Sequence, residues 1–202
     1  NSFQENTYVV SLEDKCFIVD PGNYTIEENN IIKSYINDNK LIPKLILITH
    51  CHIDHVLGIN FLTNEFSIKA YIPKSEKPLF NELVNYAPMF GFENYKSSSY
   101  IEYISKNDKL DFNKLIIDIL LLPGHSPGHL AFYFKEERKC FSGDVIFKSG
   151  IGRTDLPGGN HDTLIKSIKK ELFLLDDNVI IYPGHGPITS IKDEKLLNPF
   201  LN

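Results

Sequence analysis

The 202-residue sequence predicts an α+β fold in which two β-sheets pack face to face and helices cover their outer surfaces. One observation is that strand-like segments occur in hairpins interspersed with helical segments. Another is that every histidine-bearing motif follows a predicted strand, where loops held by a sheet commonly carry functional side chains. Length and composition fit a single domain over residues 1–202, because 42% hydrophobic and 23% charged residues are typical of globular proteins.

The first half of the chain is expected to alternate strands and helices. Two short strand-like runs predict a hairpin at residues 8–12 and 15–19. Thr25 and Glu28 have the spacing of a capping box, which predicts the start of a helix. The apolar run at residues 45–48 is typical of a strand buried on both faces. The other elements of this half are a helix at residues 56–66, a strand at 68–72 and a helix at 76–84.

Residues 85–99 interrupt this regular pattern. Aromatic residues and Met89 lie there among Pro88, Gly91 and a serine run, without helical or strand periodicity. Such a segment is either a lid over a binding site or a hydrophobic flap that packs on the core, and both interpretations stay open. Regular elements resume with a buried strand at residues 115–122, a hairpin at 130–134 and 140–142, a helix at 163–175, a strand at 179–182 and a helix at 191–197.

Charge and composition exclude several classes of partner. Twenty-one Lys and Arg against 26 Asp and Glu give a net charge of −5, so the chain lacks the basic field that attracts nucleic acid. No apolar run of about 18 residues occurs, so we expect no membrane span and no membrane partner. Three cysteines do not indicate a disulfide framework and favour a reducing, cytoplasmic location. The sequence does not begin with Met and is compatible with an upstream targeting segment.

The densest chemical signal is the run Thr-His-Cys-His-Ile-Asp-His at residues 49–55, which follows a predicted buried strand. His50, His52, Asp54 and His55 place four possible metal ligands within six residues. Imidazoles and a carboxylate offer the nitrogen and oxygen ligands that zinc and iron accept. In an extended segment His50 and His52 lie on one side, whereas Asp54 and His55 begin the next turn and can face a second ion.

Three further motifs repeat this design of a strand, a sharp or glycine-bearing loop and a ligand. His125 lies in a Pro-Gly-His-Ser-Pro-Gly-His run, Asp144 follows Ser-Gly at a strand end, and His185 lies in a Tyr-Pro-Gly-His-Gly run. Glycines permit the backbone conformations that aim such ligands inward. The four motifs together predict one shared metal site.

In this order and with these spacings, the seven residues resemble the ligand set of the metallo-β-lactamase superfamily, and the resemblance extends over essentially the whole chain. Residues 123–129 and 142–147 resemble the hydroxyacylglutathione hydrolases, also called glyoxalase II. Residues 152–159 and 183–187 are most similar to short, single-domain glyoxalase II-like hydrolases. The fold that this resemblance implies is a four-layer αβ/βα sandwich, in which helices flank two mixed β-sheets and a binuclear site lies between the sheet edges.

The resemblance also implies how the ligands divide between two divalent metal ions, taken to be Zn, with Fe or Mn as alternatives. The first ion would be held by His50, His52 and His125, and the second by Asp54, His55 and His185. Asp144 would bridge the two ions, together with a water or hydroxide. Asp54 and Asp144 are also the residues expected to act in catalysis.

The activity implied by the resemblance is hydrolysis of a small-molecule thioester, such as S-D-lactoylglutathione or a related acyl-glutathione. A hydroxide that bridges the ions would attack the thioester carbonyl. The leaving thiol, with a pKa of about 8.5, departs as thiolate without a strong general acid. Full-length glyoxalase II proteins have an additional C-terminal helical domain that helps to bind glutathione, whereas this sequence ends at residue 202, soon after His185.

Two other functions fit parts of the same pattern. A persulfide dioxygenase, from another branch of the superfamily, would hold one Fe(II) with His50, His125 and Asp144 and leave positions free for oxygen. A non-enzymatic, metal-stabilised module would instead need a closed site without exchangeable water. The run Pro-Gly-His-Gly-Pro at residues 183–187 resembles the hydrolases and favours hydrolysis.

Arg153 and Tyr182 are the predicted substrate-binding residues, and each has a second interpretation. Arg153 either binds a substrate carboxylate or pairs with Asp155, and Tyr182 either contacts substrate or packs in the core. Asp20 either orients a metal-binding histidine or caps a turn. His129 is expected to lie beside the ligands or in the core rather than to bind metal.

Overall fold

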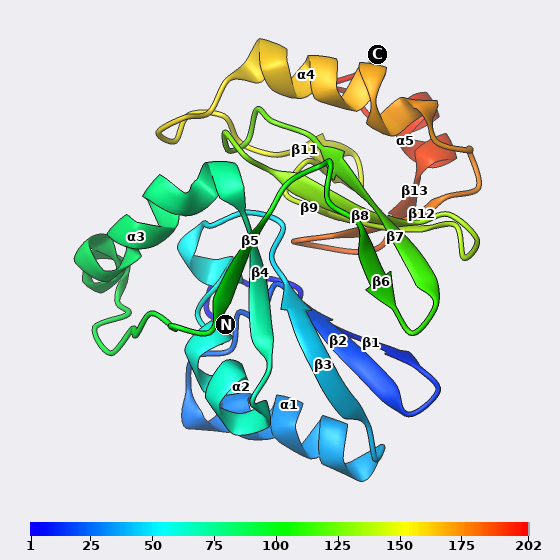
Figure 1. The fold of residues 1–202 in the computed structure, drawn as a ribbon. Helices are drawn as coiled ribbons and strands as arrows, with labels where there is room; N and C mark the ends of the chain where they lie inside the picture. Colours follow the sequence, from blue (N-terminus) through cyan, green and yellow to red (C-terminus); the bar gives the residue numbers. More distant parts are fainter. Residues whose placement is uncertain (202) are drawn as a thin grey trace.

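The computed structural model describes residues 1–201 and contains two β-sheets that face each other (Figure 1). The strands of the first sheet lie side by side in the order β1 (Tyr8–Leu12), β2 (Lys15–Val19), β3 (Ile42–Leu47), β4 (Lys69–Pro73) and β5 (Ile101–Ile104). β1 and β2 form an antiparallel hairpin, and each later strand pairs in parallel with the one before it.

The second sheet has six strands. They are β6 (Leu110–Phe112), β7 (Leu115–Leu121), β8 (Leu130–Phe134), β9 (Lys139–Gly143), β12 (Ile180–Pro183) and β13 (Thr189–Ser190). Their spatial order is β13-β12-β9-β8-β7-β6, and only β9 and β12 pair in parallel. β10 (Ile146–Phe147) and β11 (Gly150–Ile151) form a separate short ribbon. Both sheets are therefore mixed, as predicted.

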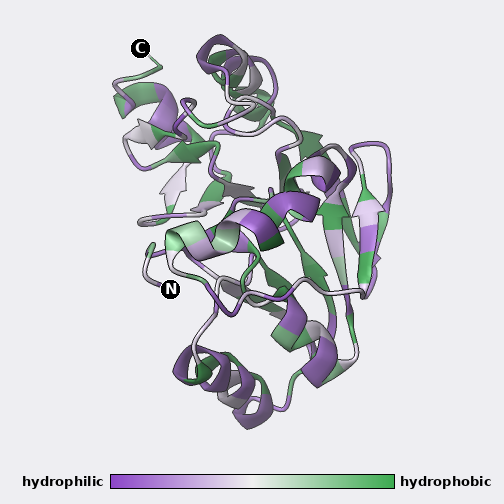
Figure 2. Cartoon of the chain, turned by 90° about the vertical axis from the view of Figure 1, so that its left-hand side faces the viewer, coloured by the Kyte–Doolittle hydropathy of each residue, from purple (hydrophilic) through white to green (hydrophobic). Residues whose placement is uncertain are grey.

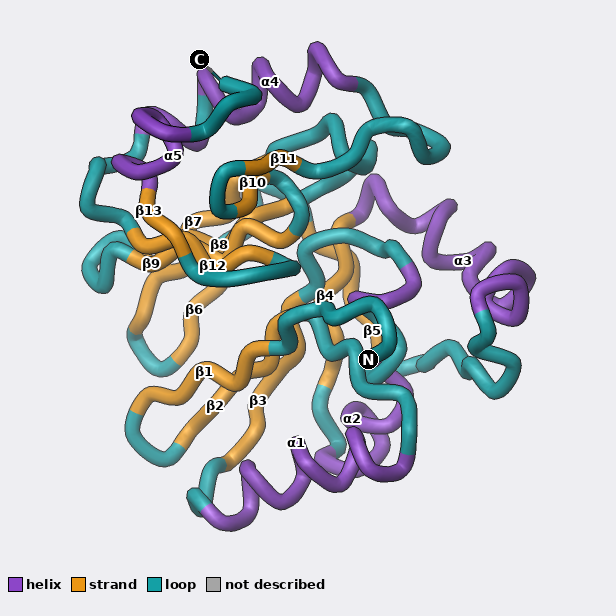
Figure 3. The backbone as a smooth tube through the Cα atoms, turned by 180° about the vertical axis from the view of Figure 1, so that it is seen from behind, coloured by secondary structure: helices purple, strands orange, loops and turns teal. Residues whose placement is uncertain are grey.

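Helices lie on the outer sides of the two sheets. The α-helices are α1 (Ile26–Asp38), α2 (Ile59–Phe66), α3 (Lys77–Tyr86), α4 (His161–Lys170) and α5 (Ile191–Leu197). The 3-10 helices are η1 (Ile53–His55), η2 (Lys74–Glu76), η3 (Ala87–Phe90) and η4 (Leu172–Leu174). α1 and α2 cover the first sheet, and α4 and α5 cover the second (Figures 1 and 3). Within residues 1–201, no helix has the length and apolar character that crossing a membrane requires.

Three clusters of buried apolar side chains fill the spaces between the four layers. The first joins Ile36 of α1 to Ile46 of β3, and the second joins Leu164 of α4 to Ile181 of β12. The third lies between the sheets and contains Phe17 of β2 with aromatic residues of the second sheet. Hydrophobic residues accordingly concentrate in the strands, whereas the outer helices carry many hydrophilic residues (Figure 2). This order of helix, sheet, sheet and helix is the four-layer αβ/βα sandwich that the sequence predicts.

Phe17 is the centre of the contact between the sheets. Its ring stacks on Phe134 with centroids 5.5 Å apart, and it meets the edge of Phe112 at 4.9 Å. It also contacts Phe141 of β9 at 6.4 Å. Because Phe17 is fully buried, these contacts tie a strand of the first sheet to three strands of the second.

Several predicted elements occur at the predicted residues. The hairpin at residues 8–12 and 15–19 and the helix at residues 191–197 are confirmed. At the start of α1, the Thr25 hydroxyl oxygen accepts from the Glu28 N–H (3.2 Å), and the Glu28 carboxylate accepts from the Thr25 N–H (3.1 Å). The capping box is therefore also confirmed.

Three predicted helices have different boundaries. The helix predicted at residues 76–84 extends over Lys77–Tyr86, because Glu76 is the last residue of η2. The helix predicted at residues 56–66 begins only at Ile59, because the ligand-bearing residues before it form η1. The helix predicted at residues 163–175 begins at His161, because the Asn160 side chain accepts from the Thr163 N–H and caps an earlier turn. It ends at Lys170, where the chain continues into η4.

The strand predicted at residues 115–122 is present, but it is not buried on both faces. Ile117 and Ile119 of β7 are buried between the sheets, whereas Ile116 and Asp118 are exposed because the other face is uncovered. The sequence analysis predicted none of β5, β6, β10, β11 and β13. Each of these strands has four residues or fewer, which is too short to produce a recognisable alternation.

Replacing Phe17 with alanine should remove the central contact between the sheets. We expect Phe17→Ala to lower the free energy of unfolding by about 3–5 kcal/mol, because the side chain is fully buried and leaves a cavity. Urea unfolding followed by circular dichroism measures this change. Ile116→Ala, on the exposed face of β7, is the control and should change the unfolding free energy by less than about 0.5 kcal/mol. Equal losses in the two variants would contradict the role of Phe17.

Candidate metal centre

The loops that carry the predicted ligands start from the carboxyl ends of strands in both sheets. β7, β9 and β12 run in the same direction, so the loops bearing His125, Asp144 and His185 leave one edge of the second sheet. The end of β3 is tied to this sheet because the Leu130 N–H donates to the Thr49 carbonyl oxygen (2.8 Å). Segments far apart in the sequence therefore meet at one edge of the sandwich.

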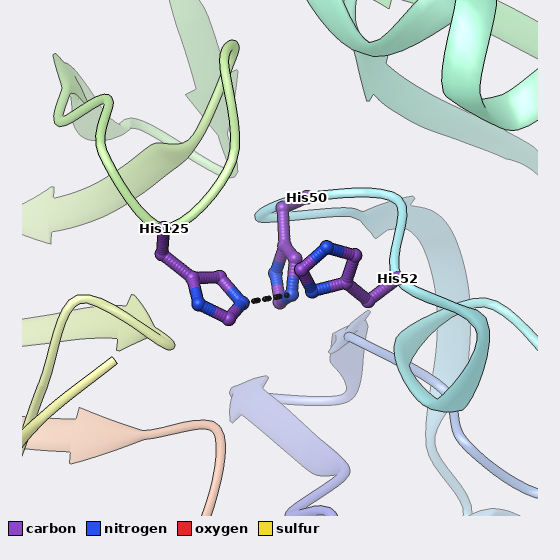
Figure 4. Close-up of side chains that lie close together, drawn as sticks. All are labelled: His50, His52 and His125. Atoms are coloured by element: carbon purple, nitrogen blue, oxygen red, sulfur yellow. Dashed lines mark hydrogen bonds between the residues drawn. The ribbon is translucent and has the colours of Figure 1, made fainter. Parts of the chain in front are cut away.

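Six of the predicted ligands form two groups of three. The ligand atoms within each group lie within 4.8 Å of one another, in His50, His52 and His125 and in Asp54, His55 and His185. Figure 4 shows the first group, in which two imidazoles project from the loop after β3 and the third approaches from the loop after β7. The sequence analysis had divided the residues in the same way.

Asp144 lies between the two groups. Its Oδ2 atom is 3.5 Å from Nε2 of His125, in the first group, and 3.5 Å from Nε2 of His185, in the second. Its Oδ1 atom is 3.5 Å from Nε2 of His55. One carboxylate thus faces both groups, which is the placement that a bridging ligand needs.

Asp20 orients two of the imidazoles. Its carboxylate accepts from the Thr49 N–H (2.7 Å) and from the Thr49 hydroxyl (2.6 Å), and it lies 3.2 Å from Nδ1 of His55. Because the Thr49 hydroxyl donates to Asp20, its oxygen is free to accept from Nδ1 of His50 at 3.0 Å. Of the two interpretations of Asp20, orientation of ligand histidines is the one that these contacts favour.

A backbone carbonyl orients the ring of His125. Nδ1 of His125 lies 2.7 Å from the carbonyl oxygen of Arg153, which can only accept a hydrogen bond. His50, His55 and His125 therefore each hold a proton on Nδ1 and present the lone pair of Nε2 to the site. Sequence reasoning had considered only the side chain of Arg153, because backbone contacts leave no pattern of residue types.

The donor atoms fit divalent cations. Nε2 of His125 and Nε2 of His50 are 3.2 Å apart (Figure 4), and two lone pairs at this distance repel each other unless positive charge lies between them. In the described part of the chain, Nε2 of His55 and Oδ1 of Asp144 are buried without a hydrogen-bond partner. Such atoms cost about 1–3 kcal/mol each when nothing satisfies them. Nitrogen and oxygen donors in this arrangement are those that divalent metals take.

The electrostatics of the site also favour cations. Burial lowers the pKa of His50 well below its usual range and the pKa of His52 to about 3, so both rings are neutral ligands at pH 7. Burial alone would raise the pKa of Asp144, but the imidazole of His55 outweighs it and lowers that pKa. Burial would likewise lower the pKa of His55, but the carboxylates of Asp144 and Asp54 outweigh it and raise that pKa. The site therefore combines the neutral imidazoles of His50 and His52 with an ionised carboxylate that attracts positive charge.

Two glycines allow the loops to approach so closely. Gly143 has a φ of +50°, in the left-handed region, immediately before Asp144. A Cβ atom at Gly184 would overlap the Asp144 carboxylate and the His55 ring. Gly143 is thus required by its backbone conformation, and Gly184 is required because no space is left for a side chain.

Glu76 connects two ligand loops, and the sequence analysis did not predict this role. Its side chain is buried, and its carboxylate accepts from the Cys51 N–H (3.2 Å) and from the Gly128 N–H (2.5 Å). Cys51 lies between two ligand histidines, and Gly128 lies in the loop of the third. A glutamate near a helix start is ordinarily solvated, so nothing in the local sequence distinguishes Glu76.

His129 supports the site without facing its centre. The ring is buried and stacks on His50 with centroids 4.7 Å apart. Its Nε2 atom accepts from the Asp144 N–H (3.1 Å), so it holds the backbone of the carboxylate between the two groups. This placement is the one that the sequence analysis expected for His129.

A cavity of about 640 Å³ opens over the two groups of ligands. His52, Asp54, His125, Asp144 and His185 line its floor. Its walls are mainly apolar and come from the N-terminal segment, from α3 and η3, and from β10, β11 and the loop after them. The metal-binding groups are therefore accessible to a small molecule.

The structure places the two predicted substrate-binding residues differently. Arg153 lines the cavity, but its guanidinium makes two hydrogen bonds to the Asp155 carboxylate (2.8 and 2.7 Å). Tyr182 is not among the residues that line the cavity; its ring stacks on Phe141 at 4.9 Å and meets Tyr8 at 5.6 Å. Of the two interpretations of Tyr182, packing between the sheets is the one that these contacts favour, because the strand turns this ring inward.

Residues 85–99 pack on the core and also contribute side chains to the cavity. Ala87 and Phe92 are buried in the cluster beneath the first sheet. Met89 and Phe90 of η3 are 83% and 51% exposed and line the cavity. The segment is anchored in the core and also forms part of the cavity wall.

Comparison with known proteins supports the resemblance seen in the sequence. Residues 1–185 match the family model of the metallo-beta-lactamase superfamily. The chain is 38% identical over 204 residues to a Haemophilus influenzae protein named hydroxyacylglutathione hydrolase GloC, covering 100% of this chain and 94% of that protein.

Two solved structures are similar along the whole chain. One is BLEG-1 B3 metallo-beta-lactamase, with a TM-score of 0.91, 31% identity and coverage of 100% of this chain and 96% of that one. The other is TTHA1623 in a di-iron-bound form, with a TM-score of 0.87, 34% identity and coverage of 100% and 97%.

Removing the Glu76 carboxylate should loosen the two loops that it connects. We expect Glu76→Ala to lower the free energy of unfolding by about 2–4 kcal/mol, because two buried N–H groups lose a charged acceptor. Glu76→Gln, which keeps one carbonyl oxygen as acceptor, should lose less. Urea unfolding measures both changes. Glu82→Ala, at an exposed position of α3, is the control, and a loss as large as that of Glu76→Ala would contradict the assignment.

Proposed function

Because the chain belongs to the metallo-beta-lactamase superfamily, we propose that it is a metal-dependent hydrolase that cleaves thioesters, with acyl-glutathiones such as S-D-lactoylglutathione as substrates. The observation that carries the proposal is the placement of Asp144 between two groups of three ligands at the floor of a cavity. The relative named hydroxyacylglutathione hydrolase, which is similar over the whole chain, supports the choice of substrate. We propose that residues 1–202 act as a single domain.

In this proposal the seven residues hold two divalent ions. His50, His52 and His125 would hold one ion, Asp54, His55 and His185 the other, and Asp144 would contact both. Bound ions would supply hydroxide at neutral pH and polarise the thioester carbonyl. Zn is the ion we propose, with Fe and Mn as alternatives that the same nitrogen and oxygen donors accept.

The chain's own residues would position the reactants. Hydrogen bonds to Nδ1 keep three imidazoles fixed, so the ligand geometry needs no rearrangement when substrate enters. Asp54 and Asp144 both line the cavity, where a carboxylate oxygen can accept a hydrogen bond from a water molecule and orient it toward the substrate. A thioester matches this site because its thiolate leaves without a strong general acid.

A persulfide dioxygenase with one Fe(II) is the alternative. His50, His125 and Asp144 lie close enough together to form its ligand triad. Nε2 of His125 is 3.2 Å from Nε2 of His50 and 3.5 Å from Oδ2 of Asp144. That function would leave Asp54, His55 and His185 without a role, although they form a second group of equal compactness. We therefore favour the hydrolase.

Hydrolysis of S-D-lactoylglutathione by the metal-loaded protein tests the proposal directly. We expect turnover by wild type and a loss of at least about 100-fold in kcat/KM for Asp144→Ala, because the carboxylate facing both ion sites is removed. Asp118→Ala, on the exposed face of β7, is the control and should match wild type.

Three results, from this assay and from parallel assays of the same protein, would overturn the proposal. The first is unchanged turnover in Asp144→Ala. The second is one iron per chain with sulfite formed from glutathione persulfide, which indicates the dioxygenase. The third is hydrolysis of a β-lactam such as nitrocefin without any thioester hydrolysis.

Removing the metals should destabilise the fold. Ions present at 100 times their dissociation constant contribute about 2.7 kcal/mol, so treatment with a chelator should lower Tm by about 5–10 °C. Differential scanning calorimetry before and after metal return measures this shift, and metal analysis should find two ions per chain. His185→Ala should show a smaller shift than Asp118→Ala, and an identical shift in both would contradict the ligand role of His185.

A further inference from the structure

We propose that the cavity selects thioesters whose acyl group is an apolar chain of several carbons, and that Met89 and Phe90 of η3 form one wall of this acyl site. The inference rests on the proposed hydrolase function and names the kind of substrate that its cavity fits. It arises from the contrast between the polar floor of the cavity and its apolar walls.

The apolar walls come from separate parts of the chain. Leu79 of α3 and the η3 residues Met89 and Phe90 form one wall. Phe147 of β10 and Leu156 of the loop after β11 line the cavity as well. Both walls belong to the same cavity as the proposed metal ligands, so a carbonyl group placed at the floor would direct its acyl chain between them.

Exposed apolar side chains are concentrated at η3. Met89 is the only methionine of the chain and is 83% exposed, and Phe90 is half exposed. Figure 2 faces α3 and shows hydrophobic residues where this helix ends. Exposed apolar groups that lie together at a cavity commonly mark a ligand-binding surface. Met is also suited to this role, because its flexible thioether adapts to ligands of different shape.

Charge makes these walls unsuited to a polar carrier. Within residues 1–201, Arg153 is the only Lys or Arg that lines the cavity, and its guanidinium is already paired with Asp155. Glutathione carries two carboxylates and an ammonium group, which gain little from apolar walls. We therefore assign the acyl group to the walls and leave the glutathione part toward the solvent.

The anchoring of η3 keeps the wall in place. Ala87 begins this turn and is fully buried, and Phe92 follows it into the core beneath the first sheet. The ring of Phe90 also contacts Phe3 of the N-terminal segment, with centroids 6.5 Å apart. The acyl site is thus already formed in the structure rather than created by closure of a loop.

Hydrolysis of a series of S-acyl-glutathiones tests the inference. We expect kcat/KM of the metal-loaded wild-type protein to rise about 15-fold from S-butyryl- to S-hexanoylglutathione, because each of the two additional buried methylenes contributes about fourfold. The double variant Met89→Gln/Phe90→Gln should reduce this ratio to about twofold. Ile26→Gln, at an exposed position of α1, is the matched control and should keep the wild-type ratio.

A binding measurement gives a readout that does not depend on turnover. S-butyl- and S-hexylglutathione are thioethers that the protein cannot hydrolyse, and isothermal titration calorimetry measures their Kd values. We expect the hexyl compound to bind about 15-fold more tightly to wild type, with a more negative heat-capacity change. The double variant should bind the two compounds with similar affinity.

The outcomes separate this inference from the proposed function. A flat or falling trend with chain length in both series overturns the acyl site, even if S-D-lactoylglutathione is hydrolysed well. A rising trend that the double variant keeps also overturns the role of η3. If no thioester is hydrolysed, the proposed function fails, and the thioether affinities alone decide whether the apolar site exists.

Discussion

Imidazole and carboxylate groups are crowded at the edge of this sandwich so closely that they require positive charge between them. Nε2 atoms of two histidines are 3.2 Å apart, and one carboxylate lies within 3.5 Å of three imidazole nitrogens. Polar atoms buried in this way are unfavourable without partners. The surrounding structure must therefore hold the groups together, and cations of suitable charge would relieve the cost.

Packing between the two sheets holds these polar groups close together. Aromatic side chains around Phe17 fill the space between the sheets and fix their separation. At the edge itself, the Leu130 hydrogen bond to Thr49 and the two hydrogen bonds of Glu76 join loops of different origin. The packing of the apolar core thus stabilises the fold enough to keep the polar groups of the site close together and rigid.

The polar groups and the apolar groups of the cavity lie on different surfaces. Its floor contains all of the histidines and carboxylates that line it, whereas its walls consist mainly of apolar side chains of α3, η3 and the β10–β11 ribbon. Ligand sites generally combine a few polar groups with a largely apolar lining. In the acyl site that we propose, this lining would distinguish one possible substrate from another, whereas the guanidinium of Arg153 lies against the Asp155 carboxylate.

The sequence by itself determined which residues are candidate ligands and where the hairpin and the capped helix begin, because ligand motifs, capping boxes and hairpins are local patterns. His50, His52 and the Thr25 capping box could be found in this way. The resemblance already implied that Asp144 lies between the two groups, and the structure supplied the distances. Tertiary structure alone decided that Glu76 joins two loops and that Tyr182 packs between the sheets. The physical reason is that these contacts join strands of different sheets, and the distance between such strands depends on how the whole core packs rather than on any neighbouring residue.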